Sequence, residues 1–346
     1  MSKRRESHGA KTKRRARTGF RLVAGIAVSV VAVVIAYLVS GEASIFKVVD
    51  LPGKGKGLVA TRDIKQGELL IREKPLFLVP SQLSSSPTQF IWEKVQSLIP
   101  ADRAAYMALS YVHLPKGADP QKQPEEVALA IFQTNAVSAG EGVGIFPRMA
   151  RLNHGCAGSF NSVYSWREDE GVLVVHALKN ISMGQELLTT YMNTKQPRTQ
   201  RRAYLAEHYG FECSCSVCSL PEEESRASDE RLTAMTSLYA RLASWENGKI
   251  GGREAGETAR EIWRVGEEEG YWSERGRLAG DMAWVAAAHS DYDAVQGWAN
   301  VAAQWYTYEL GADSSQARDM AEIAQAPHKH TARRSRTKET LKPALT

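Results

Sequence analysis

Cysteine is scarce in this sequence, and the few cysteines are unevenly placed. The chain has four among 346 residues, too few for the disulfide framework of a small secreted protein. Cys213, Cys215 and Cys218 fall in the stretch YGFECSCSVCSLP, and Cys156 lies in RLNHGCAGSFN. Thiols this close together, flanked by small serines, favour a metal site over free cysteines.

A zinc ion in a structural site takes four ligands in a tetrahedron and accepts thiolates readily. The clustered cysteines supply three ligands. Cys156 would complete a site of four thiolates, and His154 or His208 would complete one with a ring nitrogen instead. The residues alone leave these alternatives open.

A metal that joins Cys156 to the cysteine cluster would bring three stretches together, RLNHGC, ELLTTY and YGFEC. Each aromatic side chain in them, taken singly, is most simply a core residue. Taken together with an Asn-His pair, the aromatics predict a pocket with aromatic walls. The residues gathered there would be Asn153, His154, Tyr191, Tyr209 and Phe211.

The central part of the chain has no excess of basic residues. The whole chain has a net charge of +5. Residues 1–21 carry +8 and residues 327–346 carry +5, so the remaining residues, 22–326, carry −8. Nucleic-acid binders usually show a basic patch on the folded body, and the stretch YGFECSCSVCSLP itself contains no Lys or Arg. We therefore expect no direct nucleic-acid binding. An acidic body suits a basic peptide partner, although acidic side chains also serve solubility alone.

One long uncharged apolar run is present, residues 22–39. Its eighteen residues reach the lower limit for a membrane-spanning helix. We predict a single-pass membrane protein with a membrane partner through this run; a cleaved signal peptide is the less favoured interpretation. The positive-inside rule would send the rest of the chain across the membrane, where reduced thiols are less expected. The alternative is a protein of the nucleus or cytoplasm whose apolar run is not a true span.

The remaining pattern predicts strands that cluster, followed by helices, which favours an α+β fold over a parallel α/β fold. Six tryptophans lie in the helical region and are most simply core residues. The predicted parts are a basic disordered arm (1–21), the apolar run (22–39), a β-rich domain (46–220) with a helical insert (80–132) and the cysteine motif (213–218), a helical domain (222–325) and a basic disordered tail (327–346).

Four stretches in this order, GKGLVATRDIKQGELL, NHGC, GQELLTTY and FECSCSVC, resemble the SET-domain protein lysine methyltransferases with a post-SET zinc site. The resemblance covers residues 46–220. The insert and the helical region resemble the SET proteins that carry a MYND finger, but residues 80–132 contain no cysteine, so the similarity is to fungal-type proteins without that finger. It implies a β-rich SET fold with a helical insert and a post-SET zinc loop, followed by an all-α, TPR-like domain.

The resemblance also implies the cofactor and the site. S-adenosylmethionine would be bound, together with one structural zinc. Tyr191 would stand at the methyl-transfer point, with Tyr209 and Phe211 lining the cofactor and lysine channel. The other implied residues are Gly55, Lys56, Gly57, Leu58, Asn135, Asn153 and His154 for the cofactor, and Cys156, Cys213, Cys215 and Cys218 for zinc. The glycines do not have the G-x-G-x-x-G spacing of a dinucleotide-binding loop.

The implied function is methyl transfer to the ε-amine of a lysine in a protein substrate, histone or non-histone, by a monomeric enzyme. One departure from the family pattern concerns residues 157–161, where Pro-Asn commonly follows the NHSC cysteine. Here Asn161 is expected to serve after a small shift. The alternative is an inactive SET scaffold that binds partner proteins through its helical domain.

Overall fold

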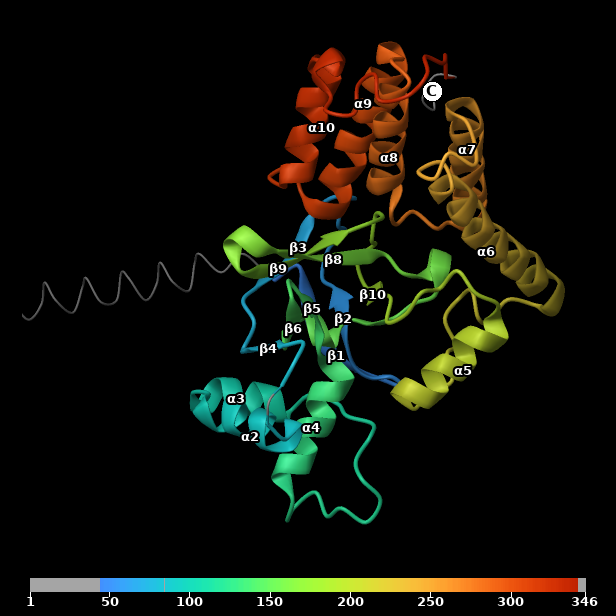
Figure 1. Cartoon of the computed structure of the whole chain (residues 1–346). Coiled ribbons are helices and arrows are strands. Elements are labelled where there is room, and N and C mark those ends of the chain that lie inside the picture. The colour runs from blue at the N-terminus through green and yellow to red at the C-terminus, as the bar shows by residue number, and fades with distance from the viewer. Residues whose placement is uncertain (1–43, 84, 342–346) are drawn as a thin grey trace, which may run out of the picture. The chain divides into compact units, whose positions relative to one another are not determined.

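The computed structural model describes residues 44–83 and 85–341 (Figure 1). The predicted α+β arrangement is confirmed: short strands, interrupted by three α-helices, occupy residues 46–189, and the chain is mainly helical from residue 198 onward. The strands are β1 (Phe46–Leu51), β2 (Gly55–Ala60), β3 (Leu69–Glu73), β4 (Leu78–Pro80), β5 (Val137–Ala139), β6 (Gly142–Gly144), β7 (Asn153–His154), β8 (Ser162–Arg167), β9 (Val172–Ala177) and β10 (Glu186–Thr189). The α-helices are α2 (Pro87–Ser97), α3 (Pro100–Met107), α4 (Pro124–Asn135), α5 (Arg198–Tyr209), α6 (Glu222–Ala243), α7 (Gly252–Glu269), α8 (Arg275–Ala288), α9 (Tyr292–Leu310) and α10 (Ser315–Gln325).

Three small sheets form the β-rich part, with the strand orders β1-β2-β10-β7, β3-β9-β8 and β4-β6-β5. The pairing of β7 with β10 is parallel, and it sets Asn153 opposite Leu188 and His154 opposite Thr189. Since β10 leads directly into Tyr191, this register brings the Asn-His pair beside the tyrosine that the sequence singles out.

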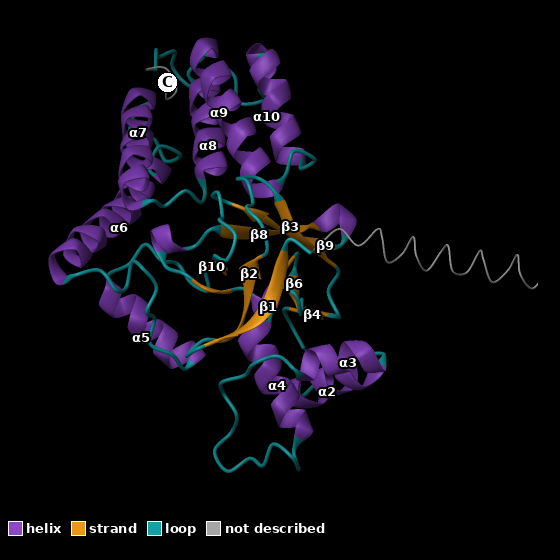
Figure 2. Cartoon of the chain, turned by 180° about the vertical axis from the view of Figure 1, so that it is seen from behind, coloured by secondary structure: helices purple, strands orange, loops and turns teal. Residues whose placement is uncertain are grey.

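The insert helices α2, α3 and α4 pack together at the end of the sheets away from α8, α9 and α10 (Figures 1 and 2). Each begins at a proline, which fits the first helical turn because its missing N–H needs no partner there. Within the predicted helical insert (80–132), helix α3 ends at Met107. Residues 108–123 are non-helical and carry Ser110 and Val112 to the wall of the cavity described below.

The helical region shares its core with the cysteines. Buried side chains of α6 to α9, among them the fully buried Trp298, belong to the same apolar cluster as the four cysteine residues. Helix α9 also packs on β8 and β9. The buried cysteines are therefore part of the same core as the helical region.

The prediction of a disordered tail over residues 327–346 is wrong for its described part, 327–341. His330 and Leu341 are buried there. The backbone N–H groups of Arg334 and Arg336 donate to the carbonyls of Ala287 and Ala288, at 3.2 and 3.0 Å. The last carbonyls of a helix need such donors, so the end of α8 holds the tail despite its basic composition.

The prediction of a single-pass membrane protein is also corrected. Among residues 44–83 and 85–341, no helix combines the length and the apolar character needed to cross a bilayer. The run 22–39, on which that prediction and the membrane partner rested, lies outside the described residues.

Candidate active site and metal site

The four cysteine sulfurs gather at one point, all within 4.8 Å of one another. The Sγ atom of Cys156 lies 4.0 Å from that of Cys213 and 3.6 Å from that of Cys218. A tetrahedral zinc with bonds of about 2.3 Å requires sulfurs roughly 3.8 Å apart, so the cluster fits the ion. His154 and His208 are not members of this group.

The electrostatics of the cluster also call for a cation. Contacts with the other three thiols, and then burial, raise the pKa of Cys156. Buried thiolates repel one another, so all four can be charged together only around a positive ion. Nearby, the side chain of Arg201 is fully buried, and its Nε and Nη2 have no hydrogen-bond partner among the described residues. A cation placed there suits a cluster of thiolates and not one of neutral thiols.

The ring of His154 connects the metal site to the aromatic pocket. Its Nδ1 accepts the backbone N–H of Tyr191 at 3.1 Å, so the ring proton lies on Nε2, which is 3.1 Å from the sulfur of Cys156 and donates to it. Burial lowers the pKa of His154 to about 4, and the ring is neutral. The side chain thereby ties a zinc ligand to the backbone of Tyr191.

A cavity of about 490 Å³ opens beside this link, a size typical of small-molecule sites. Gly57 and Leu58 were predicted to lie along the cofactor but do not line it. Leu58 is buried in the core of the sheets, and a Cβ at Gly57 would come within 2.8 Å of the Asn153 amide nitrogen. The sequence-predicted residues on its walls are Gly55, Lys56, Asn135, Asn153, His154, Tyr191, Tyr209 and Phe211.

The aromatic wall is compact. The ring centroids of Tyr191 and Tyr209 are 4.8 Å apart, and those of His154 and Phe211 are 6.4 Å apart. The Tyr191 hydroxyl donates to the carbonyl oxygen of Leu152 at 2.7 Å. Burial raises the pKa of both tyrosines, so their hydroxyls stay protonated at neutral pH. The wall thus offers apolar rings and neutral hydroxyl groups.

Two asparagines on the cavity wall are held through their amide nitrogens. The nitrogen of Asn135 donates to the carbonyls of Ser110 and Ile131, both at 2.7 Å, and that of Asn153 donates to Glu186 Oε1 at 2.9 Å. An amide fixed in this way has its oxygen left to accept hydrogen bonds from a ligand.

Sequence reasoning gave no role to several charged residues of this region, among them Lys54, Arg151 and Glu186. Glu186 bridges Asn153 and Lys54, whose Nζ lies 2.7 Å from Glu186 Oε2. The position of Glu186 inside GQELLTTY was the feature of the sequence that could have indicated its role. Lys54 and Arg151 line the cavity, and only their closeness to Gly55 and to NHGC could have indicated them.

The altered loop 157–161 supports the site in its own way. Asn161 donates from Nδ2 to the carbonyl of Glu186 at 2.9 Å and accepts the N–H of Leu188 at 2.8 Å. The carbonyl of Gly158 accepts from Lys179. Asn161 therefore braces β10, the strand that leads to Tyr191, without the usual proline.

The comparisons with known proteins agree with this arrangement. Residues 55–192 match the SET domain family. The chain contains a SET domain. It is 32% identical over 201 residues to histone-lysine N-methyltransferase set5 of Schizosaccharomyces pombe, with 58% of each chain covered. It is 30% identical over 91 residues to human histone-lysine N-methyltransferase SMYD3, with 26% of this chain and 20% of the relative covered.

The SET-domain chain thus spans little more than half of the yeast relative and a fifth of the human one. Among solved structures, the SET domain of LSMT bound to lysine and AdoHcy aligns over 83% of this chain and 93% of its own, with 14% identity and a TM-score of 0.32. A structural similarity of that degree gives no information about the site.

Proposed function

We propose that this chain transfers a methyl group from S-adenosylmethionine to the ε-amine of a lysine in a protein substrate. The observation that carries the proposal is the cavity in which Asn153 and His154, from a matched SET domain, meet Tyr191 and two further aromatic side chains. Bound there, S-adenosylmethionine would supply an electrophilic methyl group, and its carbon–sulfur bond would break as the amine nitrogen forms the new bond.

The residues of the cavity act by positioning and by excluding water. The amide oxygens of Asn135 and Asn153 would accept hydrogen bonds from the cofactor. A lysine amine must lose its proton before it can attack, and a dry aromatic channel formed by Tyr209 and Phe211 favours the neutral amine. The same rings can hold a methylated ammonium product by cation–π contact.

Tyr191 is the residue proposed at the methyl-transfer point. Its hydroxyl is fixed by the carbonyl of Leu152 and its backbone by the ring of His154. A group held at both ends can align the amine with the methyl group, and alignment of reacting atoms supplies a large part of such a rate enhancement.

The proposed zinc has a structural role. Cys156, Cys213, Cys215 and Cys218 would leave no open position on the ion, so it can bind no substrate. Its role is to join the NHGC segment to the segment that carries Phe211. Part of that second segment, Phe211 to Cys215, lines the cavity.

The substrate is a protein with an accessible lysine, and histones are the first candidates because the relatives are named histone-lysine methyltransferases. The net charge of −8 on residues 22–326 favours such a basic partner. Neither the comparisons nor the cavity supports the alternative of an inactive scaffold.

The test is methyl transfer by the zinc-loaded full chain, with labelled S-adenosylmethionine and recombinant core histones, followed by mass spectrometry of the lysines. Asn153→Ala should abolish labelling. Asn180→Ala is the matched control, because this exposed asparagine also makes a side-chain hydrogen bond, to Gln66, but lies outside the cavity. Equal labelling by wild type and Asn153→Ala would contradict the proposed site.

A further inference from the structure

The side chain of Arg201 on α5 is the one fully buried guanidinium among the described residues, and it lies beside the cysteine cluster. Its Nη1 donates to Asp229 Oδ1 on α6 at 3.0 Å and to the carbonyl of Gln196. Its Nε and Nη2 make no hydrogen bond to any described residue. Buried N–H groups without acceptors cost stability, so the arrangement calls for a compensating negative charge nearby.

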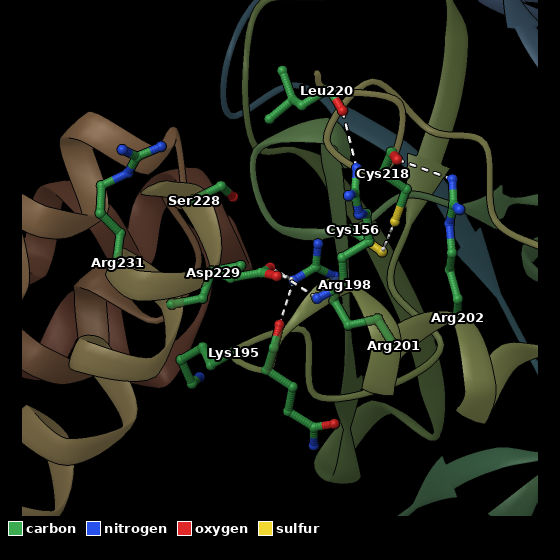
Figure 3. A network of polar contacts seen from close by, with 12 residues as sticks. Cys156, Lys195, Arg198, Arg201, Arg202, Cys218, Leu220, Ser228, Asp229 and Arg231 are labelled. Atoms are coloured by element: carbon green, nitrogen blue, oxygen red, sulfur yellow. Dashed lines mark hydrogen bonds and ion pairs between the residues drawn. The ribbon is translucent and has the colours of Figure 1, made fainter. Parts of the chain in front are cut away.

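The cysteines supply that charge once they bind zinc. Four thiolates around Zn²⁺ carry a net charge of −2, and all four residues are buried. In Figure 3 the side chains of Arg198 and Arg201 lie between Asp229 on one side and Cys156 and Cys218 on the other.

Asp229 needs the positive charge of Arg201 less than the four thiolate sulfurs do. Its side chain is 23% exposed and keeps contact with water, and it also accepts the backbone N–H of Arg198 at 2.8 Å. The sulfur of Cys218 has no such access to solvent. The buried cation therefore matters most to the thiolates.

The neighbouring arginines on α5 are engaged elsewhere. The guanidinium of Arg198 donates to the carbonyl of Leu220 at 3.0 Å and pairs with Glu222. That of Arg202 donates to the carbonyl of Cys218 at 3.0 Å and pairs with Glu212. Both retain some exposure, 19% and 34% of the side chain. Arg201 alone of the three is enclosed with the sulfurs.

We propose that Arg201 is the buried counter-cation of the zinc–thiolate cluster. The inference rests on the proposed zinc site. Arg201 is a positioning residue: it offsets the negative charge of the four thiolates and so strengthens zinc binding. Through Asp229 the same side chain connects the metal site to α6, the first helix of the helical region.

The test measures zinc affinity of the full chain by competition with a chelator at fixed pH, with folding followed by circular dichroism. Arg201→Met keeps the volume and removes the charge, and should weaken zinc binding about 10- to 100-fold, as the loss of outer-shell partners usually does. Arg201→Lys restores the charge and should recover most of the affinity. Arg198→Met is the matched control and should leave the affinity within about 2-fold of wild type, below the range typical of outer-shell losses.

The variant Asp229→Asn distinguishes two roles of Arg201: a counter-cation for the thiolates and a purely structural link to α6. It removes the partner of Arg201 on α6 but leaves the positive charge beside the sulfurs, so zinc affinity should be kept. An anchor acting only through Asp229 would give Asp229→Asn the same loss as Arg201→Met. This variant and Arg201→Lys still decide the question if Arg201→Met does not fold.

Cobalt substitution gives an independent readout. Removal of a cation near the thiolates should move the sulfur-to-cobalt charge-transfer band to lower energy in Arg201→Met and leave it in place in Arg198→Met. Wild-type zinc affinity in Arg201→Met, or an equal loss in Asp229→Asn, overturns the inference. A folded wild-type chain that binds no zinc overturns the zinc site itself.

Discussion

Replacement of Tyr191 by Phe removes one hydroxyl and leaves the ring in place. The structure assigns that hydroxyl one hydrogen bond, to the carbonyl oxygen of Leu152 at 2.7 Å, and Leu152 is buried. Loss of the bond should lower the free energy of unfolding by about 1–3 kcal/mol, the cost of leaving a buried carbonyl unpaired. The protein should stay folded, with a melting temperature lower by a few degrees.

The effect on turnover should be larger than the effect on stability. If Tyr191 aligns the amine and the methyl group, its loss should lower kcat about 100-fold, the usual consequence of misplacing reacting groups by about 1 Å. Binding of S-adenosylmethionine should change little, because the Asn153 amide is untouched. The assay is single-turnover methyl transfer with labelled cofactor, with cofactor binding measured on the same sample.

Tyr106→Phe is the matched control. Tyr106 is buried, and its hydroxyl also donates to a backbone carbonyl, that of Ala128, at the same distance of 2.7 Å. It lies in the insert and does not line the cavity. Both variants should lose similar stability, but only Tyr191→Phe should lose turnover. Full activity in Tyr191→Phe, or equal losses of turnover in the two variants, would refute the reasoning.

Three further predictions follow from the same structure. Gly57→Ala would press a Cβ to within 2.8 Å of the Asn153 amide and should weaken cofactor binding, measured by calorimetry. The control Gly256→Ala in α7 should be neutral or stabilise the chain by up to about 1 kcal/mol. Unchanged cofactor binding in Gly57→Ala would remove Asn153 from the cofactor site. Burial raises the pKa of Glu309 from 4.5 to about 7, so the folded chain holds this proton more tightly than the unfolded chain. The free energy of unfolding should therefore fall as the pH rises from 4.5 to 7, by up to about 1.4 kcal/mol per pH unit. Glu309→Gln should flatten that part of the pH profile, measured by denaturant unfolding. Cys156→Ser should weaken zinc binding and destabilise the chain by several kcal/mol if the metal contributes to folding; a variant that melts at the wild-type temperature would count against a structural zinc.

The end of α5 could be predicted from the sequence because its signal is local. Gly210 ends α5 in a left-handed conformation with φ of 69°, as a glycine after a helical pattern indicates. The end of α3 has no such signal. The stretch after Met107 keeps a helical pattern of apolar residues, but it is drawn away from helical geometry where Ser110 and Val112 reach the cavity wall.

Residue spacing reduced the number of candidate metal ligands but did not decide among them. Three cysteines in a short stretch predict a site, whereas the choice of Cys156 over His154 came only from the family resemblance. In the structure His154 serves as the hydrogen-bond partner of Cys156 instead. Nothing in the spacing distinguishes a ligand from its neighbour, because both lie on the same short segment.

Contacts between distant segments were beyond the sequence. No pattern indicates that the Tyr191 hydroxyl meets the carbonyl of Leu152, or that Arg201 is the arginine of its helix that turns inward. The basic tail was taken as disordered from its composition, yet carbonyls at the end of α8 hold residues 334 and 336. The roles of the cavity residues remain predictions that the variants above can test.

The measurement that tests the central claim most directly is calorimetric titration of the full chain with S-adenosylmethionine, with zinc assayed on the same sample. The account predicts stoichiometric cofactor binding by the zinc-loaded chain and its loss in Asn153→Ala. A folded, zinc-loaded chain that binds no S-adenosylmethionine would contradict the account, because the cavity beside Tyr191 would then have another purpose.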